Sequence, residues 1–489
     1  MRQPRDGAVT GFTKYDKILI SLFVLTLPLI NPWVRGDGVG YYAFARSLLI
    51  EHRLDFTQDW LRANASFRMG RVDAEGRIRP EERTATGKLD NHFSIGPAIL
   101  WAPLLIVAHG AVLVYDRAGG EIPADGYSAP YRTAMAVETA LYGFLALLIG
   151  FRVARAYVPE HWAFLATLGI WLGTSLPVYM TLNPSWSHAP SAFTVALFFW
   201  YWLRTRGSRT WPQWALLGIL FGLAMNVYYL NVVLLALPLL ESLGVGATAA
   251  KISREGDLKA LLGKNALFAA SALIAFAPTL LAKKIIYGSF FNFGYRESWA
   301  WSSPALLRVC FSADHGLFSW TPIVLLAVAG MAFLYKYDRQ LAICSGAVFI
   351  GYLYLVGCYQ DWDGISSFGN RFFVSLTALF VIGLAVFFDS LARAWQGAPS
   401  RAIACVASLA TASLVIWNLG LIFQWGTHLI PARGPISWRT AAYNQVAVVP
   451  LQAEGIVKGY LTGRSALMNR IEEQDVNELK AGQERAREQ

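Results

Sequence analysis

Long apolar stretches joined by short polar connections dominate this chain. A membrane-spanning helix needs roughly 20 apolar residues, and about 17 suffice in the shorter cases. Stretches of this kind lie near 18–34, 94–115, 132–151, 162–182, 188–203, 211–226, 228–243, 265–282, 317–335, 340–358, 371–389 and 402–425. The pattern therefore predicts an all-α polytopic membrane protein with about eleven or twelve membrane helices.

The basic connections then set the predicted sidedness. Lys and Arg collect in the connections 152–155, 204–209, 251–264, 336–339 and 393–401. Because cytoplasmic loops carry an excess of Lys and Arg, we expect all five on the inner side. All five connections fall on the same side of the membrane only if one of the apolar stretches before residue 152 does not cross it.

The stretch 94–115 is the candidate for not crossing. It contains Pro97 and Pro103 and ends on His109 and Gly110, which suits a re-entrant or surface-lying helix. This reading gives about eleven crossings, with the N-terminus inside and the C-terminus outside. The first apolar stretch follows basic residues and has no small-residue cleavage site, so we interpret it as an uncleaved signal anchor.

Composition agrees with a membrane protein and excludes other classes. Of the 489 residues, 55% are hydrophobic and only 15% are charged, whereas a soluble domain carries about a quarter charged residues. The net charge of +10 sits in short connections rather than on one face, so no nucleic-acid partner is predicted. The four cysteines are scattered without metal-ligand spacing.

The domain organisation follows from the same pattern. Residues 1–430 are expected to form the membrane domain, with 35–93 as a long first outer loop. Within that loop, "YYAFARSLLIEHRLDF" has an apolar face at helical spacing, which predicts an amphipathic helix on the membrane surface. Residues 431–489 lose their apolar character and are read as a short polar extracytoplasmic tail.

The chemically unusual residues all fall in the predicted outer loops. Asp37 lies between glycines in "RGDGVGYY". Asp and Gly are common in turns for conformational reasons alone. Alternatively, the glycines allow close approach of a ligand, and the carboxylate can accept a proton from a hydroxyl. Asp55 and Asp59 follow in "LDFTQDW" as second acids or as helix caps.

Later outer loops supply basic and aromatic candidates. His188 opens the stretch after "NPSWS", where Ser185 and Ser187 are possible N-caps. Arg371 opens another apolar stretch, either as a snorkelling residue or as a phosphate ligand. Further candidates are Arg296, Asp314 and His315, and the acids of "DWDG", Asp361 and Asp363. The loop tryptophans fit an interfacial belt or a stacking face for a sugar.

Four motifs, "RGDGVGYYAFARSLL", "NHFSIGPAILWAP", "SWSHAPSAF" and "SFGNRFF", give the chain between about 15 and 425 a family resemblance. It resembles the bacterial GT-C glycosyltransferases, polytopic enzymes that take sugars from polyprenyl-phosphate carriers. The resemblance implies Asp37 as the catalytic residue and Arg371 as the ligand of the carrier phosphate. Tyr41, Tyr42 and His92, which lie in the first two motifs, are further donor-binding candidates, with His188, Arg296, Asp55 and His315.

Some relatives in this family bind a divalent metal through outer-loop acids. No second acid aligns with that pattern here, so no metal is predicted and the possibility is left open, with Asp361 and Asp363 as the candidates. No other cofactor is expected.

Two classes of function follow. The first is inverting transfer of a sugar from a polyprenyl-phosphate carrier to a hydroxyl of a glycan, lipid or protein acceptor. It would take place on the periplasmic face of a bacterial inner membrane. The second is a secondary transporter or a lipid-linked-sugar flippase, for which Glu138, an acid within an apolar stretch, is the main support. No internal repeat of the kind common in transporters is evident.

Overall fold

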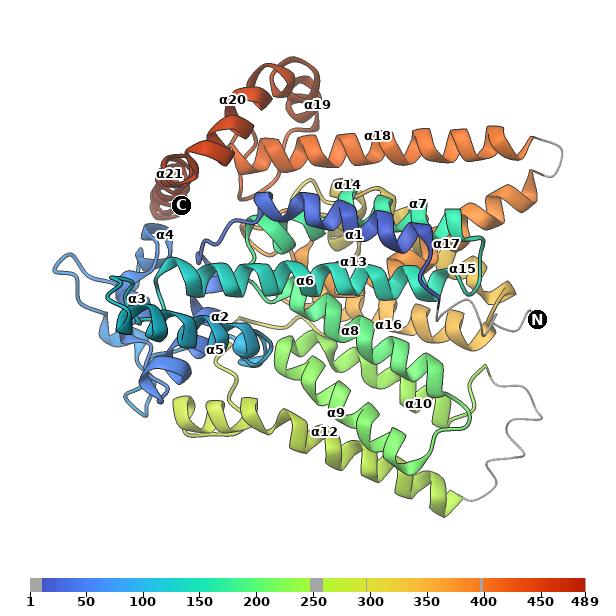
Figure 1. Cartoon of the computed structure of the whole chain (residues 1–489), viewed down its shortest axis with the longest axis horizontal. Coiled ribbons are helices and arrows are strands. Elements are labelled where there is room, and N and C mark those ends of the chain that lie inside the picture. The colour runs from blue at the N-terminus through green and yellow to red at the C-terminus, as the bar shows by residue number, and fades with distance from the viewer. Residues whose placement is uncertain (1–10, 247–257, 296, 396–398, 489) are drawn as a thin grey trace.

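Helices running side by side along the long axis of the molecule make up most of the chain (Figure 1). The computed structural model describes residues 11–246, 258–295, 297–395 and 399–488, and within them the only strand-like pairings are three isolated β-bridges. The predicted all-α polytopic membrane class is confirmed. The longer helices are α1 (Lys14–Thr26), α5 (Gly96–Arg117), α6 (Ala129–Ala154), α7 (Glu160–Leu172), α8 (His188–Thr205), α9 (Trp211–Val227), α12 (Leu258–Tyr287), α15 (Ile323–Phe333), α16 (Arg339–Cys358), α17 (Thr377–Ala394) and α18 (Ser400–Gly426).

Six helices in the described residues are long and apolar enough to cross a membrane. They are α5, α6, α12, α16, the Arg371–Ala394 segment and α18, and shorter apolar helices lie at Trp211–Val227, Tyr229–Ser242 and Ile323–Lys336. The Arg371–Ala394 segment is the centre of the bundle, because 94% of its most apolar window is buried against protein. The corresponding share is 22% for both α5 and α12, so these two helices leave most of their apolar surface for lipid.

Several predicted stretches change helix type along their length. Residues 18–34 are not one helix: α1 ends at Thr26 and a 3₁₀ turn, Leu27–Leu29, follows. Pro28 lies in that turn, where a residue without an N–H cannot continue an α-helix. Non-α segments also occur at Val178–Leu182 (π), Tyr229–Leu235 (3₁₀), which leads into α10 (Ala236–Ser242), and Arg371–Leu376 (3₁₀), which leads into α17.

The basic connections meet at one end of the bundle, the right-hand end in Figure 1. Asp16, in the first turn of α1, accepts hydrogen bonds from Arg152 Nε (3.0 Å) and Arg155 Nη1 (2.9 Å) at the end of α6. Arg206, after α8, pairs with Asp338, before α16. We call this region the basic end. The described basic loops therefore share one side, as the predicted parity of crossings requires.

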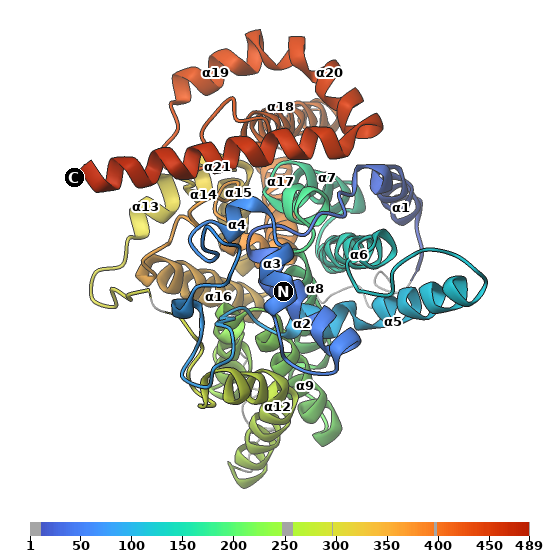
Figure 2. The same ribbon diagram turned by 90° about the vertical axis from the view of Figure 1, so that its left-hand side faces the viewer.

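Helix α5 lies at the opposite end of the bundle from the basic end, the left-hand end in Figure 1. The connection that follows it folds back on the first loop, where the Tyr42 hydroxyl donates to the Gly126 carbonyl (2.7 Å). Near the end of α5, His109 Nδ1 lies 2.7 Å from the Tyr131 hydroxyl in the first turn of α6. Figure 2 shows α5 from its side, whereas α6 is seen end-on. That 94–115 does not cross stays a prediction, which these contacts favour.

The first loop is an ordered layer over the left-hand end of the bundle in Figure 1. It contains α2 (Asp37–Arg46), a π segment (Ser47–Glu51), α3 (Thr57–Arg62), α4 (Ala65–Arg68) and a 3₁₀ turn (Pro80–Glu82). Every residue of α2 from Gly38 to Arg46 is buried. This differs from the surface-lying amphipathic helix that we expected, because α2 packs against α5.

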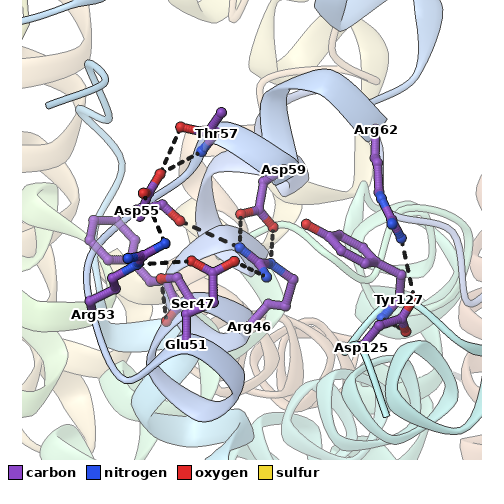
Figure 3. A network of polar contacts seen from close by, with 11 residues as sticks. Arg46, Ser47, Glu51, Arg53, Asp55, Thr57, Asp59, Arg62, Asp125 and Tyr127 are labelled. Atoms are coloured by element: carbon purple, nitrogen blue, oxygen red, sulfur yellow. Dashed lines mark hydrogen bonds and ion pairs between the residues drawn. The ribbon is translucent and has the colours of Figure 1, made fainter. Parts of the chain in front are cut away.

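A buried ion-pair network holds the first loop together (Figure 3). The Arg46 guanidinium binds both carboxylate oxygens of Asp59, each at 2.7 Å, and also Glu51 at 2.7 Å. Asp55 accepts hydrogen bonds from the Thr57 amide (3.0 Å) and hydroxyl (2.7 Å). Burial raises the pKa of Asp59 to about 6, although the close Arg46 guanidinium opposes this rise. Asp59 is thus buried within the loop, whereas 33% of the Asp55 side chain is exposed.

The chain after α18 forms three more helices, α19 (Trp438–Ala447), α20 (Val449–Thr462) and α21 (Arg464–Glu488). Figure 2 shows α21 lying across the same end of the bundle as α4. The Glu472 carboxylate accepts hydrogen bonds from the Ser66 amide (2.6 Å) and from Asn64 Nδ2 (2.9 Å). The segment that we read as a polar tail thus packs on the first loop.

Candidate active site

Asp37 is the first residue of α2, and glycines determine how that helix begins. Gly36 precedes it with φ +53°, a conformation that favours glycine. A Cβ on Gly38 would lie only 1.9 Å from Ser185 Oγ. The glycines therefore let α2 pack against the Ser185–Trp186 segment, and the close approach of a ligand that we inferred from sequence stays a prediction.

Asp37 and Arg371, far apart in sequence, form an ion pair. Arg371 Nη2 lies 2.9 Å from Asp37 Oδ2, with 32% of the Asp37 side chain and 12% of the Arg371 side chain exposed. The guanidinium carbon lies 4.5 Å from the centroid of the Trp186 ring, a cation–π distance. Arg371 Nε is buried and has no acceptor among the described residues. The guanidinium is thus fixed in place with donor capacity left over.

His188 lies beside this pair in an aromatic setting. Its buried ring makes edge contacts with Tyr179 (centroids 4.7 Å apart) and Tyr228 (5.5 Å). Its Nδ1 finds no hydrogen-bond partner in the described part of the chain. Ser187 makes no side-chain cap at the start of α8, and neither its hydroxyl nor that of Ser185 is paired there. Polar atoms therefore remain available around the pair.

A second group of candidates comes from the end of the first loop. Tyr41 contacts Phe93 (centroids 4.9 Å apart), and the His92 ring lies 5.2 Å from that of Tyr295. Burial, reinforced by the nearby Lys283 ammonium, lowers the pKa of His92. His92 is therefore neutral at pH 7 and offers one donor and one acceptor.

Aromatic residues and an acid form a further wall. Trp299 stacks on Trp301 (centroids 5.1 Å, planes 12° apart) and contacts Tyr359 (5.2 Å). Asp361 follows closely, and burial together with Glu297 raises its pKa. Aromatic faces next to carboxylates suit a polyhydroxylated ring, which stacks through its C–H groups and donates through its hydroxyls.

These walls enclose one cavity of about 1200 Å³. Asp37, Arg371, His188, Tyr41 and His92 all line it. Its side next to the C-terminal helices carries a group of apolar side chains, Leu29, Leu182, Ile422, Phe423, Leu467, Met468 and Ile471, beside the polar His428, Arg433 and Asp475. The cavity therefore joins a charged centre to a group of apolar side chains on one side and the aromatic wall on another.

Other predicted site residues lie elsewhere. Tyr42 is buried and bonded to Gly126, and Asp55 accepts a hydrogen bond from the Thr57 amide; neither residue lines the cavity. His315 and Asp363 contact each other behind the cavity wall, where His315 Nδ1 lies 3.1 Å from the Asp363 carbonyl oxygen. Arg296 lies outside the described residues.

The sequence reading missed the contribution of α21. Asp475 pairs with Arg35, two residues before Asp37, and also with His428 Nε2 (3.4 Å). Leu467, Met468 and Ile471 recur at the spacing of one helix face. This spacing indicates an apolar face on the helix, but it does not identify the surface against which that face packs.

Comparison with known proteins gives likenesses of structure. No protein-family model and no curated protein matches this chain. ArnT from Cupriavidus metallidurans, bound to undecaprenyl phosphate, is similar with a TM-score of 0.46 and 14% identity, over 84% of this chain and 70% of that one. The Archaeoglobus fulgidus oligosaccharyltransferase, in complex with Zn and sulfate, is similar with a TM-score of 0.49 and 14% identity, over 83% and 53%.

The archaeal oligosaccharyltransferase AglB from Archaeoglobus fulgidus, in complex with an inhibitory peptide and a dolichol-phosphate, has a TM-score of 0.44 at 13% identity, over 89% of this chain and 54% of that one.

Proposed function

We propose that this protein transfers a sugar from a polyprenyl-phosphate carrier to an acceptor hydroxyl, with inversion, on the extracytoplasmic face of the membrane. One observation carries the proposal: the Asp37–Arg371 pair, at 2.9 Å, lies in the wall of a cavity that has a group of apolar side chains on one side and an aromatic wall on another. A lipid-linked sugar has the same three parts, namely an apolar chain, a phosphate and a ring.

Arg371 is suited to hold the carrier phosphate. Its planar guanidinium binds phosphate oxygens with directed hydrogen bonds, and its Nε is the donor left without a partner in the described chain. Stacking on Trp186 keeps the group in one orientation. As the sugar leaves, negative charge grows on the phosphate, and a fixed cation stabilises that charge more than it stabilises the ground state.

Asp37 is suited to act as the general base. The acceptor hydroxyl gives its proton to the Asp37 carboxylate while its oxygen bonds to the anomeric carbon. The bond from that carbon to the phosphate oxygen breaks, and polyprenyl phosphate leaves with the electron pair. A single displacement of this kind inverts the anomeric centre. Binding of an anionic phosphate to Arg371 also competes with the ion pair, which leaves Asp37 freer to take the proton.

Transport is the less favoured alternative. Transporters place ionisable groups near the middle of the membrane, and Glu138 was the residue that suggested this. Glu138 is 4% exposed, lies 3.4 Å from the Tyr142 hydroxyl and does not line the cavity. The polar groups of the cavity come from the end of the bundle that carries the first loop.

Donor binding tests the role of Arg371. Undecaprenyl phosphate binding to the purified protein should weaken by about 10- to 100-fold in Arg371→Ala, because one charge-assisted contact is lost. Arg308→Ala is the matched control, since Arg308 is exposed and outside the cavity. Equal affinities in wild type and Arg371→Ala, with both proteins folded, would contradict the proposed phosphate site.

Cysteine labelling tests the proposed side of the membrane. Ala74 and Ser208 are both exposed, in the first loop and at the basic end respectively. In a Cys405→Ser background, a membrane-impermeant thiol reagent applied to intact cells should label Ala74→Cys and spare Ser208→Cys. The reverse pattern would put the cavity on the cytoplasmic side.

A further inference from the structure

Behind the cavity wall, two segments far apart in sequence bring three metal-ligating side chains together. Asp314 and His315 lie in the turn between α13 (Leu306–Phe311) and α14 (Leu317–Trp320), and Asp363 lies in the loop that leads to Arg371. One ligand atom from each of the three residues lies within 4.8 Å of the others. Asp37 is not part of this group, so the group is separate from the proposed catalytic pair.

The imidazole of this group is buried and incompletely bonded. His315 has no exposed surface, and its Nδ1 lies 3.1 Å from the Asp363 carbonyl oxygen and 3.6 Å from Asp314 Oδ1. Its Nε2 is buried without a partner among the described residues, and the same holds for Asp314 Oδ1. Unbonded buried polar atoms of this kind are rare and costly, so two of them on adjacent residues point to a missing ligand.

The backbone is also built to hold these groups. His315 has φ +55°, a left-handed conformation that a residue with a Cβ adopts at a cost. Gly364 and Ile365, directly after Asp363, have φ +75° and +62°. Strain of this kind persists where the surrounding structure fixes it, and it is concentrated at functional sites.

We propose that Asp314, His315 and Asp363 form a site for one divalent transition-metal cation, with Zn²⁺ and Mn²⁺ as the fitting ions. One imidazole with two carboxylates suits these ions better than Ca²⁺ or Mg²⁺, which favour oxygen ligands alone. Zn²⁺ binds such ligands at roughly 2.0–2.2 Å, so small side-chain rotations would bring the three ligand atoms onto one ion.

The metal ion would link the 312–316 turn to the loop that positions Arg371. Ser367 Oγ donates to the Asp363 carbonyl (3.0 Å), and a Cβ on Gly364 would lie 3.1 Å from Arg371 Nε. Arg371 therefore rests against the residue that follows Asp363. The site is structural in this account and takes no part in bond making.

Metal binding by the full-length protein tests the site. The protein in detergent is stripped with a chelator, incubated with Zn²⁺ or Mn²⁺ and desalted, and the bound metal is measured together with the unfolding temperature. We expect one equivalent of bound metal and a higher unfolding temperature in wild type. Asp314→Asn and Asp363→Asn should lose both effects, because each keeps its shape but weakens the ligand set.

Two controls separate this site from adventitious binding. Asp361→Asn changes a neighbouring acid outside the group, and His52→Ala removes a histidine in the first loop; both should keep the metal. The asparagine variants should unfold at the temperature of chelated wild type, which shows that they are folded. The absence of bound metal in wild type, or its retention in both asparagine variants, would overturn the proposal.

Discussion

Two buried arginines at opposite ends of the bundle have nearly the same surroundings. Arg209, at the basic end, lies over the Trp214 ring (4.6 Å) and pairs with Glu241 (3.1 Å). Arg371 lies over Trp186 (4.5 Å) and pairs with Asp37 (2.9 Å). Each therefore combines a cation–π contact with one carboxylate.

The difference lies in their remaining donors. Arg209 Nε donates to the Thr205 hydroxyl (2.9 Å) and its Nη2 to the Trp202 carbonyl (3.1 Å). Arg371 borders the cavity, and its Nε has no acceptor in the described part of the chain. A fully bonded arginine stabilises the fold, whereas a fixed but incompletely bonded one can bind a ligand. The comparison predicts that mutation of Arg209 lowers the stability of the fold, whereas mutation of Arg371 weakens ligand binding.

Mutation of Arg209 should produce the largest loss of stability. Arg209→Ala leaves the buried Glu241 carboxylate with the Gly207 amide (3.0 Å) but without its guanidinium partner, and breaking such an ion pair costs about 3–5 kcal/mol. We expect a much lower unfolding temperature and less folded protein in detergent, but normal transfer activity per folded molecule. A normal unfolding temperature for Arg209→Ala would show that the two arginines do not differ in the way described.

A smaller effect, confined to the cavity end, is expected from Gly38→Ala. The added Cβ would lie 1.9 Å from Ser185 Oγ, so the first turn of α2 must shift and carry Asp37 with it. Displacement by about 1 Å can cost on the order of 10²-fold in rate. Transfer should fall accordingly, and Ser185→Gly in the same chain should restore part of it.

Gly459→Ala is the matched control for this change, because a Cβ there meets nothing within 4 Å. It should leave transfer unchanged. Loss of transfer in both variants, or in neither, would show that the close fit of α2 against Ser185 does not control transfer through the position of Asp37.

The smallest effect concerns the docking of α21. Burial would lower the pKa of His428, but the carboxylates of Asp475 and Glu478 outweigh it and raise the pKa to about 9. Because the pKa is higher in the folded protein, this stabilisation is complete below about pH 6.5 and is lost as the pH rises through about 9. We expect a loss of about 1–2 kcal/mol, allowing for solvent near the pair.

Proteolysis of the C-terminal helices against pH measures this effect. Cleavage within α21 should accelerate between pH 7 and 10 in wild type and should be fast and pH-independent in His428→Gln. An identical pH dependence in the variant would mean that another group controls the docking.

The fold was largely predictable because apolar runs of membrane length have few alternatives. Asp37 and Arg371 were predictable as candidates because each is a charge at the edge of an apolar run, and the structure brings them together. The docking of α21 was not, since its apolar face is short and its partners lie in the first loop. The contact of His315 with Asp363 depends on turns with positive φ, which no periodicity reveals.

The central claim is that Asp37 is a base next to a phosphate-binding arginine. Asp37→Asn keeps the shape of the side chain but removes its ability to take a proton. With a polyprenyl-phosphate-linked sugar as donor, release of free polyprenyl phosphate should fall by about 10²-fold or more. Binding of undecaprenyl phosphate should stay unchanged or tighten slightly, because Arg371 loses a competing carboxylate. Near-normal release by folded Asp37→Asn would contradict the account.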